Sequence, residues 1–381
     1  YYTDRSTADI YKYYDDARVM YNALWDQPED YFRMVFGIGN DNDYFNGKYY
    51  SNMNHWFRVW ETVVYNDNHT IIRWNAVVML FSGGNFHVHT VFMCFFSFLG
   101  TWFILKALAR FLPEGKRKWF AFVLFLFPSY IFWTSGVLKE GLLIFGGGIV
   151  LFLAIESMAR SLRWYEWIIG FGCVYLLFHL KSYFLLALLP GWVGYVWCCS
   201  VQVKRVWIPF FIIFATGIMA FVLLPYINPD YHMGGVFKQK QDDFYRLASF
   251  MNSGSIISIP QLDGSYADLL LKSFPAFFNG LFRPLPGESF SPLVVISSLE
   301  TLFPMSVVIY LLIKRPVIDK ADLSLVFFLL SFITILMVFS GLVTPVLGAL
   351  VRYRVPCLPF IVFLGVYFLP EKIIPSFLRK K

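Results

Sequence analysis

Long apolar runs separated by short basic connections constrain this chain more than any other feature of its sequence. An apolar run of about 20 residues is long enough to cross a bilayer as a helix. Positively charged connections are retained on the cytoplasmic side of a membrane. Nine such runs predict an all-α, polytopic bundle of transmembrane helices, at about 86–110, 119–135, 141–158, 164–181, 183–200, 206–226, 294–313, 322–343 and 355–370.

The composition agrees with a membrane protein. The 381 residues are 57% hydrophobic and 20% aromatic, and the mean hydropathy is +0.56, which exceeds what a soluble domain of this length usually shows. The net charge of +7 raises the question of nucleic-acid binding. We expect no nucleic-acid partner, because the basic residues lie in short loops between spans and follow the topology rule.

The basic connections fall on the same side of the predicted spans throughout. They contain Arg110, Lys116, Arg117 and Lys118, then Arg160 and Arg163, Lys204 and Arg205, Lys314, Arg315 and Lys320, and finally Lys372, Arg379, Lys380 and Lys381. This alternation predicts a cytoplasmic C-terminus and an exoplasmic residue 1. An exoplasmic start requires either a cleaved signal or one further span upstream, and we favour the further span. We therefore expect a multi-pass protein of the inner-membrane type with long exoplasmic loops.

The predicted spans divide the chain into four segments. These are an exoplasmic region at 1–85, six spans at 86–226, an exoplasmic loop at 227–293, and three spans with a tail at 294–381. Residues 70–84 are apolar but too short to cross, so we predict a re-entrant or interfacial helix ending at Gly83 and Gly84. Residues 266–282, interrupted by Pro275, predict a second helix of this kind.

The chain opens with an acidic segment. If this segment is helical, Asp9, Tyr13 and Asp16 share one face, with Ser6 or Thr7 as the N-cap. A carboxylate held at a water–membrane boundary can act as a general base or bind a divalent cation. The alternative is a solvated amphipathic helix without a chemical role.

Lys139 and Glu140 place two ionisable groups at the predicted edge of the hydrocarbon. Such groups are usually paired or functional, although snorkelling to the interface is the alternative. His87 and His89 are two residues apart, which puts them on different helix faces, so we expect no metal site there. Nucleotide-binding and hydrolase motifs are absent from supporting contexts, which disfavours nucleotide-driven transport and dinucleotide redox chemistry.

Three arginines lie on the predicted outer face, against the positive-inside rule. Arg352 and Arg354 precede the last span, and Arg283 flanks a proline-stiffened turn with Glu288. Arginine forms bidentate hydrogen bonds with phosphate oxygens, so an anionic lipid headgroup would compensate these charges. The alternative is pairing with acidic residues of the outer loops, such as Glu288.

The pattern Asp9-x-x-x-Tyr13-x-x-x-Ala17, the many spans and the arginines at later exoplasmic helix ends resemble the GT-C class. These are integral-membrane glycosyltransferases that use polyprenyl-phosphate sugars. The stretches 128–140 and 352–356 are similar to membrane proteins of bacterial surface-glycan loci, some of them grouped with O-antigen polymerases. The chain lacks a clear Asp-Glu or Glu-x-Asp pair of the better-known members.

The resemblance implies sugar transfer from a polyprenyl-phosphate donor to a glycan or protein acceptor, and leaves Mg²⁺ or Mn²⁺ open as a cofactor. It implies that Asp9 is the catalytic base or positions the acceptor, with Asp15 and Asp16 as alternatives. The expected ligands of the lipid phosphate are Lys139, Glu140, Arg283, Arg352 and Arg354. Two rivals stay open, namely a polymerase of lipid-linked repeat units and a non-enzymatic subunit of an envelope complex. A transporter ranks last, because the spans are almost uncharged.

Overall fold

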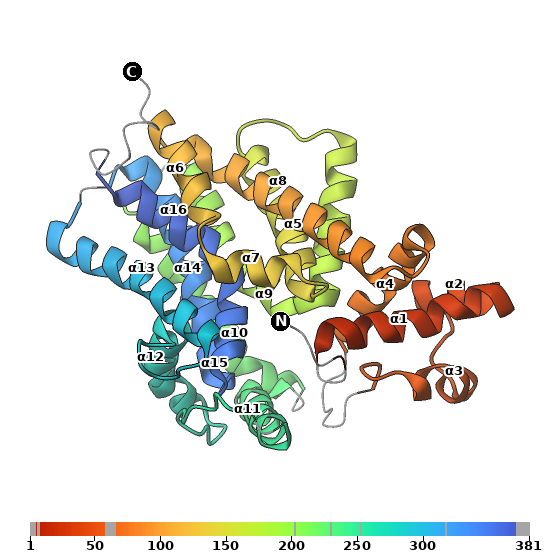
Figure 1. Cartoon of the computed structure of the whole chain (residues 1–381). Coiled ribbons are helices and arrows are strands. Elements are labelled where there is room, and N and C mark those ends of the chain that lie inside the picture. The colour runs from red at the N-terminus through yellow and green to blue at the C-terminus, as the bar shows by residue number, and fades with distance from the viewer. Residues whose placement is uncertain are drawn as a thin grey trace. The chain divides into compact units, whose positions relative to one another are not determined.

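The computed structural model describes residues 5, 8–57, 66–201, 203–228, 231–251, 253–316 and 318–370. These residues form helices, connected by turns and one isolated β-bridge between Ile256 and Val346 (Figure 1). The helices are α1 Asp9–Asp26, α2 Pro28–Phe36, α3 Asp43–Lys48, α4 Asn68–Ser82, α5 Phe86–Leu108, α6 Glu114–Leu124, α7 Pro128–Ser135, α8 Lys139–Ser157, α9 Trp164–Val201, α10 Trp207–Ile227, α11 Met233–Phe250, α12 Tyr266–Phe282, α13 Pro292–Lys314, α14 Lys320–Val343, α15 Leu347–Arg354 and α16 Leu358–Phe368. The predicted all-α fold is confirmed.

Within the described part of the chain, seven helices are long and apolar enough to cross a membrane. They are Phe86–Phe111, Lys139–Ser157, Trp164–Val201, Trp207–Ile227, Pro292–Lys314, Asp322–Val343 and Leu347–Phe368. The protein is therefore a multi-pass helical membrane protein. The count of nine spans and the orientation stay predictions, and the predicted cap at Ser6 or Thr7 and the basic tail from Lys372 onward lie outside the described residues.

The predicted spans 164–181 and 183–200 correspond to the single helix α9. Its 38 residues would extend about 57 Å if straight, well beyond the roughly 30 Å of hydrocarbon in a bilayer. The helix is broken at Lys181, whose φ of −156° and ψ of 86° are not helical. Two helical segments therefore meet at the boundary that separates the two predicted spans.

The predicted span 119–135 is divided between two shorter helices. α6 ends at Leu124, and α7 begins at Pro128. Proline is favoured in the first turn of a helix, where its missing N–H needs no partner. The apolar run therefore does not form one continuous helix, because a turn at 125–127 interrupts it.

The helices form two compact units, and each unit consists of two separate stretches of the chain. The first holds Tyr1–Ile104 and Phe132–Ser182, and the second holds Leu105–Ile131 and Tyr183–Lys381. These units do not follow the four predicted segments, since those segments were drawn from expected membrane topology rather than from packing. The segment boundaries stay predictions about topology.

In the first unit, α1 packs along α4 and α2 around a core that includes Met20, Met34 and Tyr31 (Figure 1). The helix predicted at 70–84 is α4, and it ends at Gly83, which adopts the left-handed conformation with a φ of 57°. Glycine is the usual residue at this position, because it has no Cβ to strain there. The helix and its end are confirmed, and its depth in the membrane stays a prediction.

Two glycines bring α5 and α8 into backbone contact in the same unit. A Cβ at Gly148 would overlap the carbonyl group of Gly100 on α5. Small residues allow this close approach between membrane helices, where van der Waals packing supplies much of the association energy. The N-terminus of α8, with Lys139 and Glu140, is thereby fixed within the unit.

In the second unit, α12 packs along α14 through a similar contact. A Cβ at Gly341 would overlap the carbonyl group of Ala276. The helix predicted at 266–282 is confirmed as α12, and it continues through Pro275 rather than breaking there. Its end at Phe282 leads directly into the turn that contains Arg283.

Candidate functional site

Side chains of the predicted face of α1 converge on one residue, His55, in the loop after α3. The Asp9 carboxylate lies 3.4 Å from His55 Nε2, and the rings of Tyr13 and His55 have centroids 5.1 Å apart. The Asp16 carboxylate accepts a hydrogen bond of 2.7 Å from the backbone N–H of His55. The shared face of Asp9, Tyr13 and Asp16 is therefore confirmed, and its centre is a histidine that the sequence pattern did not identify.

Asp16 has no exposed surface and holds the loop that carries His55. Its Oδ1 accepts hydrogen bonds from the backbone N–H and the side-chain amide of Asn54, at 2.6 and 3.1 Å. Burial raises the pKa of Asp16, and the hydrogen bonds from Asn54 and His55 oppose that rise. Asp16 therefore holds its neighbours in place and is not open to an acceptor substrate.

The backbone of His55 is also fixed through its carbonyl group. The side-chain amide of Asn68 donates to this oxygen at 3.2 Å, and Asn68 Oδ1 accepts a hydrogen bond of 3.1 Å from the hydroxyl of Tyr13. The loop is thus held from α1 on one side and from the start of α4 on the other. This arrangement keeps the imidazole beside the Asp9 carboxylate. Of the other two predicted catalytic carboxylates, Asp16 binds the backbone of His55, and Asp15 pairs with Arg5.

Lys139 joins the same network. Its Nζ lies 2.7 Å from Asp67 Oδ2 and 5.7 Å from the centre of the Tyr13 ring. The Lys139 side chain is only 6% exposed, so snorkelling into bulk water does not describe it. Contacts therefore run from Asp9 through His55 and Tyr13 to Lys139.

Glu140 and Asp15 have different surroundings. Glu140 lies 3.3 Å from Lys181, and both side chains are buried. Lys181 is the residue at the break in α9, so this ion pair joins that break to the start of α8. Asp15 faces outward and pairs with Arg5. Glu140 is thus part of a buried ion pair, whereas Asp15 is a partly solvated surface group.

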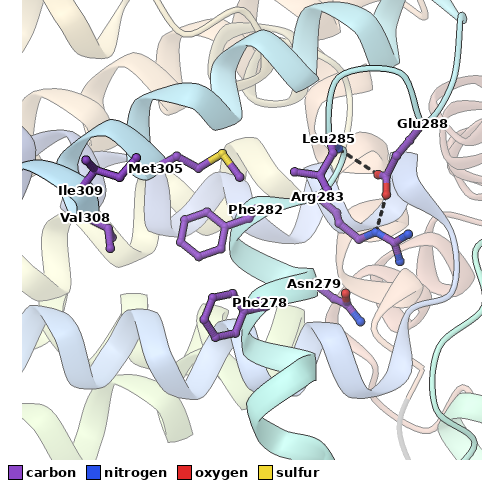
Figure 2. Close-up of a pocket in the computed structure, with 9 residues that line it drawn as sticks. All are labelled: Phe278, Asn279, Phe282, Arg283, Leu285, Glu288, Met305, Val308 and Ile309. Atoms are coloured by element: carbon purple, nitrogen blue, oxygen red, sulfur yellow. Dashed lines mark hydrogen bonds and ion pairs between the residues drawn. The ribbon is translucent and has the colours of Figure 1, made fainter. Parts of the chain in front are cut away.

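The second unit contains an apolar groove between the end of α12 and the middle of α13 (Figure 2). It has a volume of about 590 Å³. Apolar side chains form most of its lining, and the polar lining residues are Asn279, Arg283 and Glu288; the full lining is Phe278, Asn279, Phe282, Arg283, Leu285, Glu288, Met305, Val308 and Ile309. The groove therefore combines an apolar wall with a cationic side chain at one end.

Arg283 and Glu288 form an ion pair at the polar end of this groove. Arg283 Nε donates to Glu288 Oε1 at 2.7 Å, and the other carboxylate oxygen accepts from the backbone N–H of Leu285 at 2.9 Å (Figure 2). The Arg283 side chain is 26% exposed. Pairing of Arg283 with Glu288, which the sequence left as an alternative to phosphate binding, is therefore present.

Arg354 stabilises the same turn from behind. Its Nη1 donates hydrogen bonds to the carbonyl oxygens of Leu281 and Arg283, at 2.9 and 3.0 Å. Arg354 is 1% exposed, whereas Arg352 is half-buried on the same helix. Arg354 holds the backbone from which Arg283 projects, and the predicted binding of phosphate by Arg352 and Arg354 stays a prediction.

Glu300 is a further, half-buried charge that the sequence did not single out as a site residue. Its Oε1 accepts a hydrogen bond of 2.7 Å from the backbone N–H of Ser129, 171 residues away. A carboxylate at the N-terminus of a helix interacts favourably with the helix dipole, so Glu300 fastens the start of α7 to α13. Its position in an otherwise apolar run was the one signal in the sequence.

The predicted residues thus belong to two groups. Asp9, Asp15, Asp16, Lys139 and Glu140 lie in the first unit, and Arg283, Arg352 and Arg354 lie in the second. In the described parts of the chain, no three His, Cys, Asp or Glu side chains are arranged to hold a metal ion. These residues do not fit an Mg²⁺ or Mn²⁺ site, and no chemical step is assigned to such an ion here.

No family model, no curated protein and no solved structure matches this chain.

Proposed function

We propose that the protein is an integral-membrane glycosyltransferase of the GT-C type, which transfers a sugar from a polyprenyl-phosphate donor to an acceptor hydroxyl. The proposed setting is surface-glycan assembly at the exoplasmic face of a bacterial inner membrane, with the C-terminus in the cytoplasm. The observation that carries the proposal is the apolar groove that ends at Arg283. A polyprenyl phosphate has the matching chemistry, because it joins a long apolar chain to an anionic head.

The groove supports binding of the lipid in two ways. Phe278, Phe282 and Ile309 offer apolar surface to the isoprenoid chain, and the burial of that surface is favourable by roughly 25 cal/mol per Å². Arg283 bonds Glu288 through Nε, and a guanidinium group has four further N–H donors for phosphate oxygens. Neutralising the leaving phosphate is the contribution expected to lower the reaction barrier most.

The cluster around His55 supports a role in activating the acceptor. In the proposed reaction, the acceptor oxygen attacks the anomeric carbon while the bond from that carbon to the phosphate oxygen breaks. The hydroxyl proton passes to Asp9 or to its neighbour His55, and polyprenyl phosphate leaves. Asp9 is 41% exposed, so a hydroxyl can approach its carboxylate from solvent.

The two rivals make different use of these features. A polymerase of lipid-linked repeat units needs the same groove and arginine, but depends less on Asp9. A non-enzymatic subunit is favoured by one specific observation, because the charges of the candidate site already pair with one another, as in Lys139–Asp67 and Arg283–Glu288. The open groove is the feature that a purely structural subunit does not need.

Two substitutions in the native host separate these functions. Asp9→Asn and Arg283→Ala are scored for loss of a surface glycan at unchanged protein level in the membrane. Loss in both supports the transferase, loss only in Arg283→Ala supports the polymerase, and a normal glycan in both refutes the enzymatic proposal. Matched controls are Asp26→Asn at the exposed end of α1 and Arg315→Ala at the exposed end of α13, and both should leave the glycan unchanged.

A further inference from the structure

A serine, a histidine and an asparagine form a hydrogen-bonded row where α4 meets α5. Ser82 Oγ lies 2.9 Å from His89 Nε2, and His89 Nδ1 lies 2.8 Å from Asn75 Oδ1. His89 is completely buried, and Ser82 is half-buried at the end of α4. All three residues lie in the first unit, and none belongs to the cluster around His55.

The neighbouring groups determine where the protons lie in this row. The Asn75 side-chain amide donates to the carbonyl oxygen of Ile71 at 2.9 Å, which turns its Oδ1 toward His89. An amide oxygen only accepts, so His89 carries its proton on Nδ1 and leaves Nε2 as an acceptor. The hydroxyl of Ser82 therefore donates to Nε2.

This direction of hydrogen bonding is the one that activates a serine. The nucleophile must donate to a base, and the base must be oriented by a third group. The backbone N–H of Gly84 also donates to Ser82 Oγ, at 3.2 Å. This donor places partial positive charge near the oxygen, which stabilises the negative charge of an alkoxide.

We propose that Ser82 and His89 are the catalytic residues of a second activity, the transfer of an acyl group from a lipid ester to water. Ser82 Oγ attacks the ester carbonyl carbon as its proton moves to His89 Nε2. The bond from that carbon to the alcohol oxygen then breaks, and the alcohol leaves with the proton. A water molecule attacks the acyl-serine by the same route, which releases the carboxylic acid and restores Ser82. Asn75 acts through His89 as a positioning residue.

The surroundings of Ser82 favour an ester with an apolar acyl chain. Phe81, the preceding residue, is 73% exposed, and Leu80 is 45% exposed. Phe81 also packs against Phe92 of α5, with ring centroids 6.3 Å apart, and α5 is long and apolar enough to cross a membrane. The approach to Ser82 is thus continuous with a surface suited to lipid tails, and it offers no charged group for a polar substrate along these residues.

The test uses the full-length protein in detergent micelles and a fluorophosphonate with a decyl chain as the probe. We expect a covalent adduct on Ser82, located by peptide mass spectrometry, which is absent in Ser82→Ala. His89→Gln should slow labelling at least tenfold, and Ser51→Ala, an exposed serine of the same unit, should leave it unchanged. No adduct on Ser82 of the unmodified protein would overturn the proposal.

Two further measurements separate catalysis from packing. The unfolding temperature is recorded for each variant, and Asn75→Asp is included because it keeps the acceptor facing His89 Nδ1. We expect Asn75→Asp to label within threefold of the unmodified protein. Equal labelling in a folded His89→Gln variant would mean that the probe reacts without a base, which refutes the assignment. If His89→Gln fails to fold, loss of labelling in a folded Asn75→Leu and its retention in Asn75→Asp decide the question.

Discussion

Replacing Asp16 by asparagine tests whether this buried carboxylate holds the loop of His55. One oxygen of the carboxylate accepts from Asn54 and the other from the backbone N–H of His55. An asparagine has a single acceptor oxygen, so its amide group must face one of these donors. The less costly arrangement keeps both bonds to Asn54 and leaves the N–H of His55 without an acceptor.

The size of the effect follows from that arrangement. A hydrogen bond to a charged group contributes about 1.5–3 kcal/mol, and a buried donor left unpaired costs about 1–3 kcal/mol. The substitution also removes the desolvation cost that raises the pKa of Asp16, which offsets part of the loss. We expect the free energy of local opening to fall by about 2 kcal/mol, which increases the opening equilibrium constant roughly thirtyfold.

Amide hydrogen exchange measured by mass spectrometry on peptides covering residues 53–57 reports this opening directly. The matched control is Asp15→Asn. Asp15 lies on the same helix as Asp16, but it is partly exposed and pairs with Arg5. Exposed ion pairs contribute little, so the control should change exchange by about 0.5 kcal/mol, or roughly twofold. Exchange in Asp16→Asn that stays within twofold of the unmodified protein would refute a loop held by this carboxylate.

Three other predictions concern stability, each measured by the thermal unfolding midpoint. Burial raises the pKa of Asp30, but hydrogen bonds from tyrosines, Tyr49 among them, and a nearby lysine outweigh it and hold this pKa below its usual value. The resulting stability is present above the unfolded pKa of about 3.9 and is lost as pH falls through the folded pKa. Asp30→Asn should therefore reduce the fall of the unfolding midpoint at acid pH. Identical pH profiles of the midpoint in the two proteins would contradict this. Gly148→Ala should destabilise the protein by about 1–3 kcal/mol, because the added Cβ overlaps the α5 backbone. The control Gly172→Ala, with open space around it, should not lower the midpoint. Equal midpoints in the two variants would show that α5 and α8 can move apart without cost. Arg354→Met should lower the midpoint by leaving two buried carbonyl groups without a donor, at about 1–3 kcal/mol each, and an unchanged midpoint would mean that water replaces the guanidinium.

Apolar runs predicted the helices well where packing did not interrupt them. The run at 266–282 corresponds residue for residue to α12, because its length and pattern are set locally. The run at 119–135 was misleading, because hydropathy does not register the turn at 125–127. Pro128 was the available signal, since a proline fits the start of a new helix better than the interior of an old one.

The candidate site shows the opposite limit. The common face of Asp9, Tyr13 and Asp16 followed from helical periodicity, which is a local property. The group they contact, His55, lies 39 residues beyond Asp16 in an irregular loop, where no periodic pattern points to it. Contacts of this kind depend on tertiary packing, so the sequence identified one side of the pair and not the other.

The three predicted arginines show why charge alone did not define their roles. In the predicted topology all three oppose the positive-inside rule, and the sequence offered the same two roles for them, phosphate binding or pairing with acidic residues of the outer loops. In the structure, Arg354 donates to the carbonyl groups of Leu281 and Arg283 from a fully buried position, whereas Arg283 lies partly exposed at the end of the groove. A planar guanidinium group suits the buried position, because its several N–H donors can hydrogen-bond to both carbonyl oxygens at once.

Arg354→Lys should therefore weaken lipid-phosphate binding by displacing Arg283, and not by removing a charge. Titration of the purified protein with a polyprenyl phosphate should show weaker binding in Arg354→Lys despite its unchanged net charge, and equal affinity would show that the position of Arg283 does not depend on Arg354.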